Sequence, residues 1–142
     1  MPTFAEISKT PDGFRAVRNI PRNAVRLLWC SDFWDGPRSG MLELDGERCW
    51  YQVVAENDDE DLRGWYRRFV VVRLTPAQRA EEERWHELFR ENVGGHTDYD
   101  ASGTGWVGDL RPLEQWREFY EPYERRQPLD LSHNEVLGWF ED

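Results

Sequence analysis

Long apolar runs are missing from this chain of 142 residues, and none approaches the roughly 18 residues that a membrane-spanning helix needs. The first ten residues also lack the basic stretch followed by an apolar stretch that is typical of a secretory signal. We therefore expect a cytoplasmic protein without a membrane partner.

Cysteine is scarce as well. Cys30 and Cys49 are too few for a disulfide framework, and each is expected to be a small buried thiol. A bridge between them stays open as an alternative if their strands are neighbours.

Lysine is almost absent, since Lys9 is the only one beside 17 arginines, and acidic residues outnumber basic ones by 28 to 18. The net charge of -10 argues against a nucleic-acid partner that is bound through its phosphates. The charge is uneven, because residues 1–55 hold seven acidic and seven basic side chains while residues 56–142 carry the whole excess. The acidic second part is suited to a basic protein surface.

Aromatic residues, in contrast, are plentiful, with eight Trp, seven Phe and five Tyr. A chain of this length and aromatic content can bury a core without a metal or a disulfide. We expect one domain over residues 1–142, strand-rich over 14–74 and helix-rich over 75–142.

A hairpin is the clearest local structure. Asp45-Gly46 separates two alternating runs, and a two-residue turn of this type pairs Leu44 with Glu47. The register also predicts an ion pair between Glu43 and Arg48. Both faces of this hairpin carry large apolar side chains, so both are expected to be at least partly covered.

Further strands are expected over 24–29 and 65–74, with a weaker one over 14–20, and an acidic loop over 56–61. Thr75 and Gln78 form a capping-box pattern that predicts a helix to about Val93. A second helix is expected over 113–120, ended or kinked at Pro122, and a third over 132–140. Strands followed by helices predict an α+β fold: an antiparallel sheet of four to five strands with the C-terminal helices packed on it.

The loop between the first strand and the hairpin is the candidate binding site. It is rich in Gly and Pro, yet it carries bulky aromatic side chains. Trp and Arg are common anchors of protein interfaces. The candidate residues are Phe33, Trp34, Asp35, Arg38 and Ser39, of which Trp34 is the one least expected in the core.

Metal binding is a second hypothesis. Residues 98–109 match a calcium loop in part, with oxygen ligands Asp98, Asp100 and Ser102, a glycine at the sixth position and Asp109 at the twelfth. The alternative is a turn-rich loop whose side chains bond their own backbone. His86, His96 and Asp98 are candidate ligands for a transition metal. Neither a cofactor nor a metal is the favoured interpretation.

These observations favour a non-catalytic protein-interaction or regulatory domain of the inhibitor or immunity type, with another protein as partner. The alternative is a small-molecule-binding protein or hydrolase-type enzyme with a site near Asp32–Ser39, and calcium binding at Asp98–Asp109 is a further one. The sequence leaves the identity of the partner and the oligomeric state open.

Overall fold

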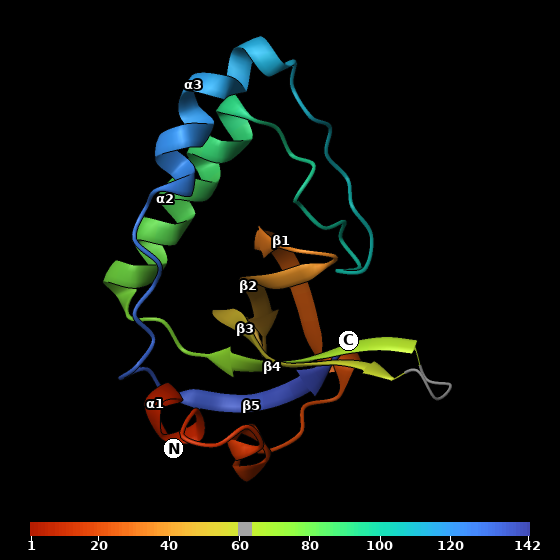
Figure 1. Cartoon of the computed structure of the whole chain (residues 1–142), viewed down its shortest axis with the longest axis vertical. Helices are drawn as coiled ribbons and strands as arrows, with labels where there is room; N and C mark the ends of the chain where they lie inside the picture. Colours follow the sequence, from red (N-terminus) through yellow and green to blue (C-terminus); the bar gives the residue numbers. More distant parts are fainter. Residues whose placement is uncertain (60–63) are drawn as a thin grey trace.

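A five-stranded antiparallel sheet forms the centre of the fold. The computed structural model describes residues 1–59 and 64–142, and for residues 57–59, 64 and 65 it describes the backbone alone. The strands lie in the order β1-β2-β3-β4-β5 (Figure 1). Their bounds are Val25–Phe33, Pro37–Leu44, Glu47–Asp59, Gly64–Val72 and Val136–Glu141. With two long helices following β4, this arrangement confirms the predicted α+β class.

The predicted hairpin is confirmed, but its ion pair is wrong. Leu44 is paired with Glu47 across the turn, and Asp45 and Gly46 have φ values of 52° and 78°. Glu43 instead forms an ion pair with Arg26 of β1, with 3.1 Å between Nη2 and Oε2. Arg48 reaches Glu83, with 3.1 Å between Nη1 and Oε1. Glu43 and Arg48 therefore pair with neighbouring elements and not with each other.

The strands around the hairpin are longer than expected. β1 and β2 extend into the predicted loop, so that only three residues separate Phe33 from Pro37. β3 continues through Asp59, so that most of the predicted acidic loop over 56–61 is strand. The last two residues of that loop, 60 and 61, lie outside the described residues.

The third predicted helix is wrong, because residues 136–141 form β5. This strand pairs with the exposed edge of β4, with Trp139 opposite Val70. Ser132 and Glu135, which resemble a capping box in the sequence, do not cap a helix. Ser132 donates to Asp130, and Glu135 forms an ion pair with Arg73. Gly138 disfavours a helix, and a Cβ at this position would lie 2.5 Å from Ile20 Cδ1. Pairing with a distant strand thus overrides the local helix signal.

The N-terminal segment borders the other edge of β5. The weak strand predicted over 14–20 is mostly wrong, because Gly13–Ala16 forms the 3-10 helix η1 and Asn19 alone makes a parallel bridge, to Trp139. The short helix α1 (Phe4–Ile7) precedes it, and a 3-10 turn, η2 (Arg22–Ala24), leads into β1. The segment before β1 therefore lies beside the last strand of the sheet.

Both faces of the sheet bury apolar side chains, as expected from the hairpin. One face carries Leu42, Leu44 and Tyr51, which pack with Phe69 and Phe140. The opposite face carries a second cluster that includes Met41, Trp50, Val70 and Val72, together with Ile7 and Phe14 from the N-terminal segment. Cys30 and Cys49 are buried free thiols within these layers.

The helices α2 (Pro76–Asn92) and α3 (Leu113–Glu124) pack side by side (Figure 1), and the His86 ring of α2 packs on Trp29 of the sheet. The predicted capping box of Thr75 and Gln78 is present, while Pro122 lies inside α3 rather than ending it. The two helices share their own aromatic cluster, centred on Phe89 and Tyr123. None of the described helices has the length and apolar character that would let it cross a membrane.

Candidate functional site

The turn between β1 and β2 displays two large aromatic side chains. Phe33 and Trp34 are 58% and 72% exposed, although most aromatic side chains of the sheet are buried. Asp35 and Gly36 have positive φ values of 52° and 127°, and Trp34 N donates to Gly36 O over 2.9 Å. The chain therefore reverses tightly just where the most exposed of the described tryptophan side chains lies.

A buried arginine from β4 holds this turn. Arg67 is only 4% exposed, and its Nη1 donates to Pro37 O over 3.0 Å while its Nη2 donates to Trp34 O. Its Nε lies 3.3 Å from Glu56 Oε1, which balances the buried charge. A Cβ on Gly36 would lie 2.6 Å from Arg67 Nη1. The guanidinium thus fills the space beneath the turn and fixes the backbone at Trp34.

The five candidate residues of this loop have different roles in the structure. Phe33, Trp34 and Asp35 are exposed on the turn. Arg38 is directed to carboxylates, with 2.6 Å between Nη1 and Glu56 Oε1. Ser39 is buried in β2 and 6% exposed. Only the first three residues are therefore placed to contact another molecule.

The connection between α2 and α3 brings a second group of exposed side chains to the same place. Trp106 is 45% exposed and Val107 is 61% exposed. The Trp106 ring makes an edge contact with Phe33, with 6.4 Å between ring centroids and 66° between planes. Its indole also stacks on Tyr99 at 4.3 Å. We call Phe33, Trp34, Trp106 and Val107 the apolar surface.

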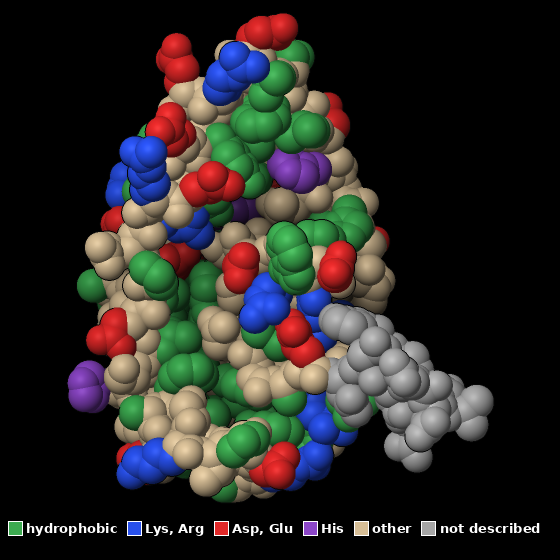
Figure 2. All heavy atoms as spheres, in the orientation of Figure 1, with side chains coloured by type: hydrophobic (Ala, Val, Ile, Leu, Met, Phe, Trp, Pro, Cys, Tyr) green, Lys and Arg blue, Asp and Glu red, His purple; other side chains and the backbone are tan. Residues whose placement is uncertain are grey.

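Carboxylates border the apolar surface. Asp35 follows Trp34, and Asp100 and Asp109 lie in the loop that carries Trp106. None of these three forms an ion pair within the described part of the chain. Figure 2 shows exposed hydrophobic groups near the middle of the face drawn, with acidic groups on either side and basic groups directly below them. These three carboxylates are therefore not neutralised by an ion pair within the described residues.

The predicted metal ligands His86 and Asp98 lie together in a hydrogen-bonded cluster with Arg90. His86 Nε2 lies 2.8 Å from Asp98 Oδ1, and Arg90 Nη2 lies 2.8 Å from Asp98 Oδ2. Burial raises the pKa of Asp98, but hydrogen bonding and charge from His86 and Arg90 outweigh it and leave that pKa below its usual value. His96 is nearby against Phe89, and burial lowers its pKa.

Of the remaining calcium-loop candidates, Asp100 and Ser102 form hydrogen bonds within their own loop. Asp100 Oδ1 accepts from the backbone N of Ser102 over 3.0 Å, and the side chain of Ser102 also donates to it. These bonds lower the pKa of Asp100. Asp109 is exposed, and among the side chains that the structure describes no three His, Cys, Asp or Glu are grouped as metal ligands. Calcium or transition-metal binding at these residues stays a prediction, which a melting curve with and without added metal would test.

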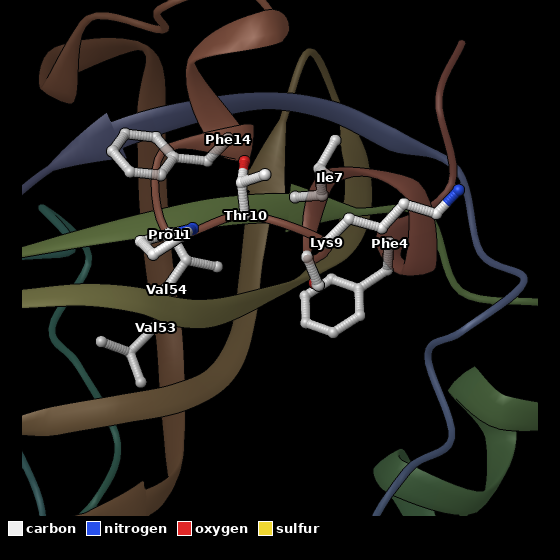
Figure 3. Close-up of a pocket in the computed structure, with 9 residues that line it drawn as sticks. Phe4, Ile7, Lys9, Thr10, Pro11, Phe14, Val53 and Val54 are labelled. Carbon is white, nitrogen blue, oxygen red and sulfur yellow. The ribbon is translucent and has the colours of Figure 1, made fainter.

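Two cavities lie near these elements. The larger, of about 590 Å³, is bounded by Arg22, Pro37, Tyr99, Trp106 and Asp142, so it adjoins the apolar surface. The smaller, of about 350 Å³, lies between the N-terminal segment and β3. Figure 3 shows its lining of mostly apolar side chains, with the Lys9 side chain extending past Phe4.

Comparison of the chain with protein families, curated proteins and solved structures finds no significant match. The interpretation of the site therefore depends on its own geometry. Sequence reasoning identified Trp34 and Phe33 but missed Arg67, Trp106 and Val107. Arg67 lies in a strand 30 residues beyond Pro37, and no local pattern marks it as the support of the turn.

Proposed function

We propose that this chain is a non-catalytic protein-interaction domain whose apolar surface binds a partner protein with basic side chains around an apolar centre. The observation that supports this best is the exposure of Phe33 and Trp34 on a turn held by the buried Arg67. Burying a guanidinium costs free energy unless its hydrogen bonds are satisfied. The use of a buried arginine to fix an exposed turn therefore favours a binding role for that turn. A fixed turn also loses little conformational entropy on binding.

The charge pattern supports a basic partner. Carboxylates without ion pairs in the described residues border the apolar surface, and helices α2 and α3 carry nine carboxylates against four arginines. Such a field accelerates association with a positively charged surface and weakens as salt rises. A regulatory or inhibitory domain of the immunity type would use both properties.

A capture experiment with a matched control tests this proposal. The protein and its Trp34→Ala and Leu113→Ala variants are immobilised and exposed to lysate of the source cells. The affinity of each variant for the recovered partner protein is then measured. Leu113 is 45% exposed, but it lies at the start of α3 and outside the apolar surface. We expect Trp34→Ala to weaken binding by at least about tenfold, as for an interface hot spot, and Leu113→Ala to leave it unchanged.

Two outcomes contradict the proposal. Equal affinity of the wild type and the Trp34→Ala variant would remove the apolar surface as the contact. Binding that is insensitive to salt, with a partner whose surface is acidic, would remove the charge argument.

A small-molecule site near the Asp32–Ser39 loop is the second candidate function. The observation that favours it is the larger cavity, whose wall includes Pro37 of this loop. Asp32 of the same loop is paired with Arg38, with 3.5 Å between Nε and Oδ2, so we infer binding rather than hydrolysis there.

We also propose a cytoplasmic location, which the two free buried thiols support because they suit a reducing compartment. Fractionation of source cells with an antibody against the chain tests this location, and recovery outside the cytoplasm would contradict it.

A further inference from the structure

The larger cavity is formed by segments that are far apart in the sequence. Its walls come from the η2 turn, the start of β2, the loop around Trp106 and the end of β5. At about 590 Å³ it lies in the usual range of small-ligand sites, roughly 300–1,000 Å³. Because the tertiary structure alone joins these segments, the cavity is a property of the folded chain.

One wall is aromatic and rigid. Trp106 stacks on Tyr99 with 4.3 Å between ring centroids and 28° between ring planes. Tyr99 packs in turn against the core cluster of the sheet, and burial raises its pKa. Trp106 remains 45% exposed, so this wall offers a supported apolar surface to a ligand.

Another part of the lining is polar, and its charges are paired. Arg22 Nε donates to Asp142 Oδ1 over 3.0 Å, and its other nitrogens donate to Val25 O over 3.2 Å and Gly103 O over 3.1 Å. The guanidinium is therefore fixed, and its charge is balanced by Asp142. An anionic ligand would meet this carboxylate, so the pair disfavours a phosphate or a carboxylate ligand.

Hydrogen-bonding groups of both kinds remain at the cavity. The side chain of Asp142 is 41% exposed, and its carboxylate can accept a further hydrogen bond. The side-chain amide of Asn23, which has no hydrogen-bond partner among the described residues, can donate and accept. The hydroxyl of Thr104 donates to Ser102 Oγ over 2.6 Å, because Ser102 gives its own proton to Asp100, and it can still accept from a ligand. A matching ligand is neutral and carries several groups that donate and accept at once.

We propose that this cavity binds a saccharide unit of a neutral glycan. A pyranose ring has C–H faces that pack on an aromatic wall, and its hydroxyl groups both donate and accept hydrogen bonds. The balanced Arg22–Asp142 pair provides both kinds of partner without attracting an anion. This inference goes beyond the proposed protein contact, although Trp106 belongs to both surfaces.

Titration of the full chain by two-dimensional NMR tests the proposal. The probes are maltose, cellobiose, lactose and N,N′-diacetylchitobiose, with glucose 6-phosphate and adenosine as comparison ligands. We expect at least one of the four saccharides to shift the Trp106 indole and Asn23 amide signals, with a dissociation constant of about 1–10 mM. The comparison ligands are expected to bind more weakly.

Variants separate this site from the protein contact. Thr104→Val removes a hydroxyl at nearly constant size, and Trp106→Ala removes the aromatic wall. Each of these two variants should weaken saccharide binding by at least about fivefold. Trp34 lies outside the cavity lining. Trp34→Ala should therefore leave saccharide binding unchanged while it weakens binding of the partner protein. Circular dichroism checks that each variant is folded, so that loss of binding is distinguished from unfolding.

Three results would overturn the saccharide proposal. The first is the absence of shifts at the cavity with all four saccharides up to about 50 mM, which lies well above the expected dissociation constants. The second is tighter binding of adenosine or glucose 6-phosphate, which would assign the cavity to a base or a phosphate ester. The third is unchanged saccharide binding in both Thr104→Val and Trp106→Ala.

Discussion

The imidazole of His86 stacks on the indole of Trp29, with 4.0 Å between ring centroids and only 3° between ring planes. The contact joins α2 to β1. Because His86 Nε2 also lies 2.8 Å from Asp98 Oδ1, the same side chain reaches the loop that carries Trp106. One residue therefore connects α2, β1 and the loop that carries Trp106.

This cluster predicts a pH dependence of stability. The pKa of Asp98 is lowered in the folded protein, so its contribution to stability is present above the unfolded value of about 3.9 and is lost as pH falls towards the folded value. We expect Asp98→Asn to lower the free energy of unfolding at pH 7 by about 3 kcal/mol. Urea unfolding between pH 7 and about 2 should show a shallower acid dependence for the variant. Parallel curves for wild type and variant would contradict the role of Asp98.

The support of the β1–β2 turn by Arg67 predicts a high cost for Gly36→Ala. The backbone at Gly36 has a φ of 127°, and the added Cβ would lie 2.6 Å from Arg67 Nη1. We expect a loss of about 1–3 kcal/mol in urea unfolding from the strained backbone, and a further loss from the contact with Arg67. Gly46→Ala is the matched control, because its φ is also positive but no atom lies within 4 Å of the added Cβ. An equal loss in both variants would show that Arg67 does not restrict the turn.

The two tryptophans of β1 and its turn should behave in opposite ways. Trp29 is 6% exposed and stacked on His86, so Trp29→Ala is expected to cost about 3–5 kcal/mol of stability. Trp34 is 72% exposed, and Trp34→Ala should change stability by no more than about 0.5 kcal/mol. Thermal and urea unfolding measure the stability change of each variant. A large loss for Trp34→Ala would indicate a structural role for this side chain instead of a binding role.

The thiols should be unreactive in the folded protein. Burial raises the pKa of Cys30 to about 12 and that of Cys49 to about 11. Almost no thiolate is then present at pH 8, whereas an unfolded cysteine has a pKa of about 8.5. We expect Ellman's reagent to detect neither thiol before urea is added and both afterwards. Rapid reaction of one thiol in the folded state would show that its strand opens locally.

Local patterns in the sequence determined much of the fold. Asp45-Gly46 defined the register of the β2–β3 hairpin, because a tight turn with positive φ values leaves little freedom of pairing. Thr75 and Gln78 likewise defined the start of α2, because both capping bonds lie within four residues. The exposure of Trp34 was also predictable, since it lies among residues that favour turns.

The tertiary structure alone decided the features that depend on distant partners. Residues 136–141 became a strand because the edge of β4 was free to pair with them, and this pairing outweighed a helix signal in the preceding residues. Arg67 could not be recognised as the support of the turn, since its acceptors Trp34 O and Pro37 O are some 30 residues away in the chain. The composition thus determined that aromatic side chains and carboxylates are abundant. Only the folded chain decided that Phe33 meets Trp106, because contacts between distant segments depend on how the whole sheet packs.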